Sequence, residues 1–267
     1  MYIEFLISTM NRKDFSFIHE MFKNVQAEDF AVLVINQCTN IALEEVKDCD
    51  FRNTRVISVL DKGLSKSRNL ALKNAMGEIC VLTDDDVVYE TNVIKSITKG
   101  FEKEIDVLTF QASYVNGKPF KKYSEVGFYH NFRSIMKISS IECAFRLDFL
   151  RKTGVKFDEL FGLGTNFQAC EENIFFLDLL NQKARMLYEP LKLVVHPYEE
   201  TGGVLNEKGV YTRGAVFYRM FGLSGLIIAW LFVLKKKEVI KKEKISLFYS
   251  FRLIWKGFWD YSKIEKK

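Results

Sequence analysis

The sequence predicts an α/β protein built on an open, mostly parallel β-sheet with helices on both faces. Two observations lead to this fold class. Short apolar runs alternate, through the first half of the chain, with segments whose apolar residues recur at helical spacing, and this βαβ rhythm is typical of such sheets. The chain has 267 residues, of which 48% are hydrophobic, and this is enough to bury one sizeable core.

The first half of the chain supplies five expected strands with helices between them. The strands are expected at Ile3–Ile7, Ala31–Ile35, Arg55–Leu60, Ile79–Thr83 and Val107–Gln111. The helices are expected at Phe15–Val25, Ser65–Met76 and Val93–Phe101.

Ligands of such sheets bind beyond the carboxyl ends of the strands, so the polar residues that follow the strands should converge on one crevice. Each of these residues alone is more typical of a turn or a helix cap, and only their convergence indicates a site. They are Ser8, Thr9, Asn11 and Arg12 after the first strand, Asn36 and Gln37 after the second, and Asp84, Asp85 and Asp86 after the fourth.

The three aspartates follow the apolar run Ile79–Leu82 directly. Carboxylates at the end of a buried strand repel one another and lose hydration, so a positive partner is expected there, most simply a divalent cation. Hard oxygen ligands suit Mg²⁺ or Mn²⁺, which keep positions open for the phosphates of a substrate. The alternative is an acidic turn that caps a helix beginning near Thr91.

The stretch from Lys118 to Phe145 is less regular, with aromatic residues among basic ones. It is either an insertion that faces an acceptor or irregular packing, and packing is slightly favoured. A glycine-rich loop then leads into Glu171 and Glu172, which open an amphipathic helix at Asn173–Leu180. Acids in a first helical turn are common because they oppose the helix dipole, so the two glutamates alone do not define a site.

His196 ends a further apolar strand that begins near Leu191. A single histidine at a strand end is usually a hydrogen-bonded structural residue. This one follows a Val-Val strand, as the aspartate cluster follows its own strand, so a metal or phosphate ligand in the same crevice is the alternative.

The cysteines and the amino terminus indicate a reducing compartment. The five cysteines form no C-x-x-C pair, so neither a zinc site nor a disulfide framework is expected, and Cys38 and Cys80 are expected in the core. The first eight residues are typical of a strand rather than of a secretory signal. We therefore expect a cytoplasmic location.

The positive charge of the chain is concentrated at its carboxyl end. Residues 235–267 hold 11 Lys and Arg against 4 Asp and Glu, a local +7, whereas residues 1–234 carry −2 of the overall +5. A nucleic-acid-binding protein more often carries its basic stripe on the folded domain, so no nucleic-acid partner is expected. A basic tail behind an apolar stretch instead indicates an anionic membrane surface.

That apolar stretch, Phe221–Leu234, contains no charged residue and is shorter than the roughly 20 residues of a spanning helix. It predicts an interfacial or re-entrant helix, with a buried core helix as the alternative, and the aromatic and basic residues of Phe248–Tyr261 favour surface binding. We therefore divide the chain into an α/β domain at residues 1–208 and a helical membrane-association region at residues 209–267, peripheral on the inner face of the cell membrane.

Three motifs, in this order, resemble an inverting glycosyltransferase of family 2 with the GT-A fold. They are the first strand and turn, Phe5–Arg12; the G-L-S-x-x-R-N helix with the A-x-G-E, apolar strand and D-D-D that follow it, Gly63–Asp86; and the helix start at Glu171–Glu172. The second motif is the most specific of the three, and the resemblance covers about residues 1–200.

The resemblance implies roles for these residues. Asp84 and Asp86 match the outer acids of the D-x-D motif, so Asp86 would bind Mn²⁺ or Mg²⁺ and Asp84 would contact ribose or metal-bound water. Glu172 matches the general base, with Glu171 as the alternative. A downstream histidine near the metal and diphosphate is matched by His196. The nucleotide, most often a uridine nucleotide in this family, would be held by Thr9, Arg12 and Asn36, with Asp85 beside it and with Arg68 and Asn69 on the helix beneath.

The resemblance implies the transfer of a sugar from a nucleotide sugar, with UDP as the expected nucleotide, to a hydroxyl of a glycan or lipid-linked acceptor in cell-surface polysaccharide synthesis. A carboxylate takes the proton of the hydroxyl during attack, and the cation balances charge on the departing diphosphate, a task that Arg213 could share with His196. Two alternatives are a metal-dependent nucleotidyltransferase and a non-catalytic nucleotide-sugar-binding module. The loop Ser8–Arg12 has no glycine, which disfavours the first, and the intact metal and base residues disfavour the second.

Overall fold

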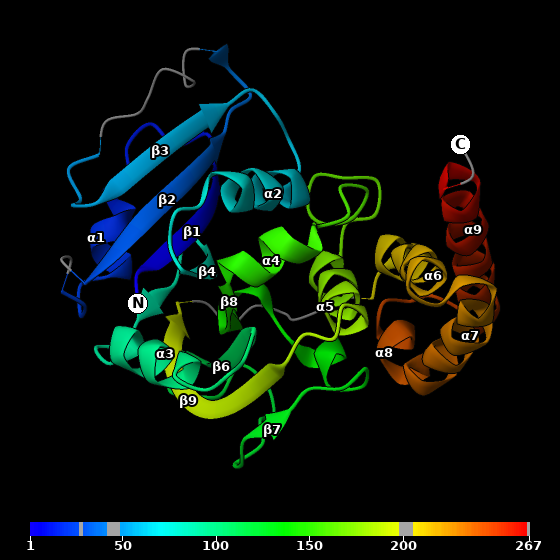
Figure 1. Cartoon of the computed structure of the whole chain (residues 1–267). Helices are drawn as coiled ribbons and strands as arrows, with labels where there is room; N and C mark the ends of the chain where they lie inside the picture. Colours follow the sequence, from blue (N-terminus) through cyan, green and yellow to red (C-terminus); the bar gives the residue numbers. More distant parts are fainter. Residues whose placement is uncertain (27–28, 42–48, 198–204, 266–267) are drawn as a thin grey trace.

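The computed structural model describes residues 1–26, 29–41, 49–197 and 205–265, and within them it shows a mixed nine-stranded sheet with helices on both faces (Figure 1). The strand order is β3-β2-β1-β4-β8-β6-β9-β5, and β7 pairs with β9. This confirms the α/β fold class. The strands are β1 Ile3–Met10, β2 Phe30–Gln37, β3 Thr54–Val59, β4 Ile79–Asp84, β5 Val88–Tyr89, β6 Val107–Tyr114, β7 Phe128–Tyr129, β8 Cys143–Arg146 and β9 Met186–His196.

The parallel part of the sheet is the amino-terminal half. Strand β1 pairs in parallel with β2 and β4, and β2 pairs in parallel with β3. Every residue of β2 is buried, because helices cover both faces of the sheet there. The register places Ser8 opposite Asp84 and Thr9 opposite Asn36, so the predicted polar residues do meet at one edge.

Strand β8 was not expected from the sequence. It lies between β4 and β6 and is antiparallel to both, whereas β6 and β9 are parallel. Three of its four residues fall in the stretch assigned to irregular packing or an insertion, and α4 (Leu147–Thr153) begins at the residue after the strand. A run this short carries no periodicity of its own, so only pairing with its neighbours defines it as a strand.

Two hydrophobic clusters occupy the two faces of the sheet. One contains Ile18 of α1 and Ile97 of α3; the other contains Ala71 of α2, Leu150 of α4 and Phe175 of α5. Cys38 and Cys80 are buried, as expected. The helices of this part are α1 Phe17–Met21, shorter than expected, α2 Leu64–Asn74, α3 Val93–Phe101, α4 Leu147–Thr153 and α5 Glu171–Asn181, which includes both glutamates.

The carboxyl-terminal helices are docked on the α/β part. Helices α6 and α9 cross very closely, since a Cβ added at Gly257 would lie 2.0 Å from the carbonyl oxygen of Tyr211. Phe258 of α9 shares a third hydrophobic cluster with Ile174 of α5. The helices are α6 Glu207–Phe221, α7 Gly225–Lys235, α8 Lys237–Lys242 and α9 Leu247–Glu265.

Ion pairs reinforce this docking, because Arg219 of α6 lies 2.7 Å from Asp178 of α5 and 2.9 Å from Asp158. The division of the chain at residue 208 remains a prediction.

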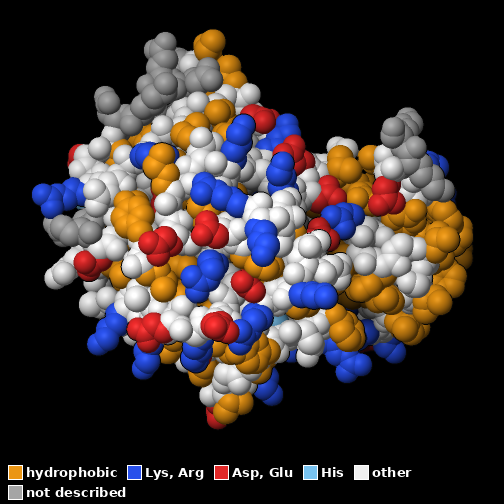
Figure 2. Space-filling view, viewed as in Figure 1, with side chains coloured by type: hydrophobic (Ala, Val, Ile, Leu, Met, Phe, Trp, Pro, Cys, Tyr) orange, Lys and Arg blue, Asp and Glu red, His pale blue; other side chains and the backbone are white. Residues whose placement is uncertain are grey.

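The expected Phe221–Leu234 helix is interrupted, because a short 3₁₀ turn at Gly222–Ser224 separates α6 from α7. Figure 2 shows hydrophobic side chains gathered on the outer side of this helical region.

Candidate active site

A cleft of about 740 Å³ opens at the carboxyl ends of β1 and β4. It gathers six of the ten predicted site residues, which are Thr9, Arg12, Asp84, Asp85, Asp86 and His196. The other residues that line it are Ser8, Met10, Asn11, Gln37, Lys62, Leu64, Leu163, Gly164 and Gln168. The convergence expected from parallel-sheet geometry is therefore present.

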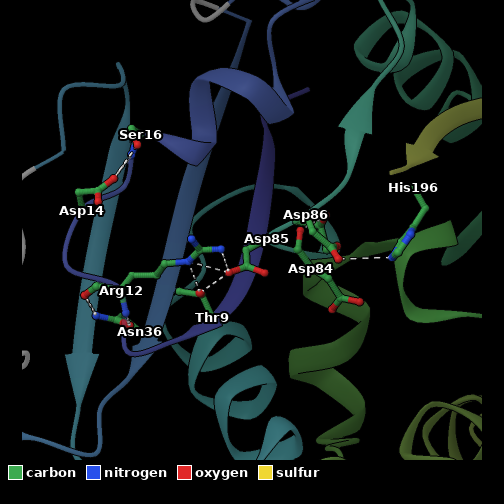
Figure 3. A network of polar contacts seen from close by, with 10 residues as sticks. Thr9, Arg12, Asp14, Ser16, Asn36, Asp84, Asp85, Asp86 and His196 are labelled. Carbon is green, nitrogen blue, oxygen red and sulfur yellow. Dashed lines mark hydrogen bonds and ion pairs between the residues drawn. The ribbon is translucent and has the colours of Figure 1, made fainter. Parts of the chain in front are cut away.

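The three aspartates turn toward three different partners, and Figure 3 shows two of these, Arg12 beside Asp85 and His196 beside Asp86. Asp85 turns toward Arg12, whose Nε and Nη2 donate to its Oδ2 at 2.9 and 2.6 Å. Asp86 turns toward His196, with 3.5 Å between Oδ2 and Nε2. Asp84 lies 3.5 Å from a guanidinium nitrogen of Arg68. This divergence reduces the repulsion among the three carboxylates.

Burial raises the pKa of Asp84, while the nearby Arg68 opposes that rise. Its neighbours Asp86, Glu171 and Asp85 add to the rise because they are negative. An additional positive charge in the cleft would therefore stabilise the ionised form of Asp84.

Asn36 is fully buried and does not line the cleft. Its Oδ1 accepts from the backbone N–H of Arg12 at 3.0 Å, and its Nδ2 donates to the carbonyl of Arg12 at 3.0 Å. The guanidinium of Arg12 lies 4.7 Å from the ring centre of Phe17 and also donates to Thr9. Asn36 thus fixes the loop that carries Arg12, and an amide is required because both a donor and an acceptor are used.

Arg68 links the aspartate cluster to the glutamate pair. It is 3% exposed, and its guanidinium donates to Glu171 Oε1 at 2.8 Å and to Ser140 Oγ at 2.8 Å. Although burial opposes its charged form, Glu171, Asp84 and Glu172 together hold the pKa of Arg68 above its usual value. Buried charges persist only when they are paired and hydrogen-bonded, as this one is.

Glu171 and Glu172 differ in what surrounds them. Glu171 is buried and paired with Arg68, whereas Glu172 is half-buried and, among the described residues, forms no ion pair and shares a side-chain hydrogen bond with Glu171. Burial and the adjacent negative charge of Glu171 raise the pKa of Glu172 to about 8. Neither glutamate lines the cleft itself; Glu171 is linked to it through Arg68, whose positive charge also acts on Glu172.

The start of α5 is held from both sides. Gly162 has φ +100°, and a Cβ there would lie 3.1 Å from Ser65 Oγ and 3.2 Å from the Glu171 carboxyl carbon, so glycine lets the loop pass between α2 and the acid. Arg213 of α6 donates to the thiol of Cys170, the residue before Glu171, and does not line the cleft. The predicted contact of Arg213 with a diphosphate therefore remains a prediction.

The metal implied by the resemblance can be tested against the side chains. Within residues 1–26, 29–41, 49–197 and 205–265, no group of three or more His, Cys, Asp or Glu side chains is arranged to hold a metal ion. Two atoms that could bind a metal ion lie close together, Asp86 Oδ2 and His196 Nε2. They are 3.5 Å apart, which is long for a hydrogen bond. This pair fits a Mg²⁺ or Mn²⁺ ion that takes its remaining ligands from water and substrate phosphate.

The sequence reasoning missed several residues of the cleft. Lys62 lies directly before Gly63, which has φ +129° and whose carbonyl accepts from Gln37. A lysine just before a helix start is a phosphate-ligand pattern that could have been noticed. Leu163, Gly164 and Gln168 carry no such signal, because they reach the cleft only when the loop folds back over α2, where Leu163 accepts from the backbone of Leu64.

Comparison with known proteins defines the class. The sequence matches the family described as Glycosyl transferase family 2 over residues 5–171, which is more than half of the chain. The chain therefore belongs to glycosyltransferase family 2 and is a glycosyltransferase. A search of curated proteins found no matching relative.

Solved structures of S. aureus TarS share the fold, in agreement with the GT-A architecture. TarS residues 1–349 in complex with UDP-GlcNAc gives a TM-score of 0.63 at 18% identity over 91% of this chain and 74% of that one. The same TarS fragment in complex with UDP gives 0.61 at 20% identity over 88% and 72%. At this identity the likeness shows the fold alone.

Proposed function

We propose that the enzyme transfers a sugar, with inversion, from a nucleotide sugar bound in the cleft to an acceptor hydroxyl that approaches Glu172. The observation that carries the proposal is the difference in partners between Glu171 and Glu172. Glu171 is committed to buried Arg68, which leaves Glu172 as the half-buried carboxylate with a raised pKa. A base whose pKa lies near the working pH is the most effective one.

The nucleotide is expected at the β1 side of the cleft. Thr9 and Arg12 are fixed there by Asp85, and Asn36 holds the Arg12 backbone. Lys62 also lines the cleft and is proposed as a cation for phosphate. UDP is the proposed nucleotide, because structures of TarS that share the fold were solved with UDP and with UDP-GlcNAc.

The diphosphate is expected beside Asp86 and His196. These two residues would hold a Mg²⁺ or Mn²⁺ ion, which when bound supplies positive charge for the developing diphosphate anion. His196 is 4% exposed and packs against Tyr114 and Phe120, so its ring is held in place without the ligand. The chain's own contribution is thus a pair of potential metal ligands in the cleft, of which His196 is held by packing.

The acceptor hydroxyl loses its proton to Glu172 as its oxygen attacks the anomeric carbon from the face opposite the diphosphate. The sugar–oxygen bond forms as the sugar–phosphate bond breaks, and the electron pair of that bond leaves with the nucleoside diphosphate. An α-linked donor then gives a β-linked product. Arg68 is paired with Glu171, so that Glu172 is the acid available to exchange a proton.

The acceptor that we propose is a glycan or lipid-linked hydroxyl used in cell-surface polysaccharide synthesis. The alternative of a nucleotidyltransferase is set aside because the chain belongs to glycosyltransferase family 2. A purely binding module is disfavoured because binding does not require a general base. The pairing of Glu171 with Arg68 leaves Glu172 in the position of such a base.

The test is a panel of nucleotide sugars measured by thermal shift and by release of nucleoside diphosphate, each with Mn²⁺, with Mg²⁺ and with EDTA. We expect one UDP-sugar to raise the melting temperature and to be hydrolysed slowly only when metal is present. Asp14→Asn, which changes an exposed acid that does not line the cleft, serves as the control for Asp86→Asn. A metal-independent turnover equal to that with Mn²⁺ would contradict the metal assignment.

A further inference from the structure

Helix α7 and the turn before it expose a stripe of large hydrophobic side chains. Leu223, Ile227, Trp230, Leu231 and Leu234 follow one another at intervals of three and four residues, or stand next to each other, so they share one side of the helix. Their exposed fractions run from 43% at Trp230 to 69% at Leu223. We name these five residues the α7 apolar face; Figure 2 shows hydrophobic side chains gathered on the outer side of the carboxyl-terminal helical region.

The opposite side of α7 is made of small residues packed on protein. Gly225, Ala229 and Val233 are buried, and a Cβ at Gly225 would lie 2.0 Å from the carbonyl oxygen of Phe217 in α6. An ordinary surface helix turns its large apolar side chains inward and its polar ones outward. Here the smallest residues face inward and the largest face outward, so the exposed face is suited to a further apolar environment.

A lysine cluster directly follows this face. Lys235, Lys236, Lys237, Lys241, Lys242 and Lys244 are all exposed, and the same ten residues contain only two acids, Glu238 and Glu243. An apolar helix face beside a dense set of lysines is the pattern of a segment that lies in the headgroup region of an anionic bilayer. A second copy of the chain would carry the same positive cluster, which disfavours pairing through this side.

The geometry favours lying on the bilayer over crossing it. Residues 207–235 form one helical stretch that is long and apolar enough to span a membrane by length and composition, with a mean hydropathy of 1.8 over its best window. The stretch is broken at Gly222, which has φ +58°, and its first half is ion-paired to Asp178 through Arg219. The second half, α7, is 11 residues or roughly 16 Å long, about half of the hydrocarbon thickness.

We propose that the α7 apolar face and the lysine cluster attach this enzyme to an anionic lipid bilayer, with α7 in the plane of the interface. The leaflet is the cytoplasmic one, which is rich in anionic lipid. Because α6 and α9 are docked on α5, this attachment holds the catalytic domain itself at the membrane surface. The inference concerns a surface that the proposed transfer reaction does not use, and its test does not depend on activity.

The test is co-sedimentation of the full chain with vesicles of phosphatidylcholine alone and of phosphatidylcholine mixed with phosphatidylglycerol. We expect strong binding to the mixed vesicles that weakens but persists in high salt, because salt screens the lysines and leaves the apolar contact. Replacing three lysines, Lys235→Gln, Lys236→Gln and Lys237→Gln, should weaken binding by about 100-fold at low salt, from roughly fivefold for each. In a variant that keeps Trp230 as its single tryptophan, Trp255→Phe/Trp259→Phe, the fluorescence should shift to shorter wavelength on binding and be quenched by brominated lipid tails.

The apolar contact is tested by Leu223→Gln, Ile227→Gln and Leu231→Gln together, which should lower binding to mixed vesicles by about 100-fold or more. The matched control replaces three equally exposed hydrophobic residues elsewhere, Met76, Val115 and Val126, by Gln and should bind as the parent chain does. Equal loss in this control would overturn the assignment. So would sedimentation velocity showing a dimer that the α7 triple variant makes monomeric, together with no binding to vesicles.

Discussion

Glu172→Gln is expected to abolish transfer and, at alkaline pH, to stabilise the fold. The carboxyl has a pKa of about 8 in the folded protein against a usual value of 4.5, because it is partly withdrawn from water and lies beside the negative charge of Glu171. A raised pKa means that the folded state binds this proton more tightly than the unfolded state does. The stability from the protonated form is therefore complete below pH 4.5 and is lost as pH rises through about 8.

The size of this effect follows from the shift. One pKa unit corresponds to about 1.4 kcal/mol. Ionisation of Glu172 can therefore lower the free energy of unfolding by at most about 5 kcal/mol. Solvent access to Glu172 and its interaction with Glu171 reduce this to about 2 to 4 kcal/mol. Glutamine keeps the shape and cannot ionise, so we expect Glu172→Gln to be more stable than the parent by this amount at pH 9 and equal to it near pH 4.

Two assays are needed, urea unfolding at several pH values and donor turnover with UDP binding measured beside it. Turnover should fall by about 100-fold or more while UDP binding persists, and the rise of kcat/KM with pH near 8 should disappear. Glu102→Gln, at an exposed position after α3, is the control. An unchanged pH profile, or full activity with UDP binding intact, would show that Glu172 is not the base.

Three further predictions follow from the contacts. Asp86→Ala should leave the fold intact and lower Mn²⁺-dependent turnover by 10-fold or more, and a chain equally active in EDTA would contradict this. Arg68→Met leaves Glu171 buried without its partner, so urea unfolding should show a loss of about 3 to 5 kcal/mol, much of it recovered in the double variant Arg68→Met/Glu171→Met. Gly257→Ala forces α9 away from the Tyr211 carbonyl and should cost about 1 to 3 kcal/mol. Because α6 and α9 share a hydrophobic cluster with α5, one cooperative transition should move to lower temperature in Gly257→Ala; two separate transitions would show that the helices are an independent unit.

The sequence by itself determined the strands of the parallel half and the residues at their ends. Alternation of apolar runs and helical spacing fixed β1, β2, β4 and α3 within a few residues, since burial on both faces imposes continuous apolar runs. It also determined that Asp84, Asp85 and Asp86 end one strand of that sheet. Sheet geometry alone then requires Thr9 and Arg12, which follow the neighbouring strand, to lie beside them.

Only the tertiary structure decided which acid has which partner. Asp84, Asp85 and Asp86 are adjacent in sequence but turn toward Arg68, Arg12 and His196, which come from three different elements. The order of Glu171 and Glu172 says nothing of which is paired, because the choice depends on where α2 places Arg68 after the sheet has formed. Strand β8 and the Leu163–Gln168 wall of the cleft were likewise decided by pairing and packing between distant segments, which leave no periodic pattern in the chain. Local patterns record which face of an element is buried, and contacts across long separations exist only once the core has closed.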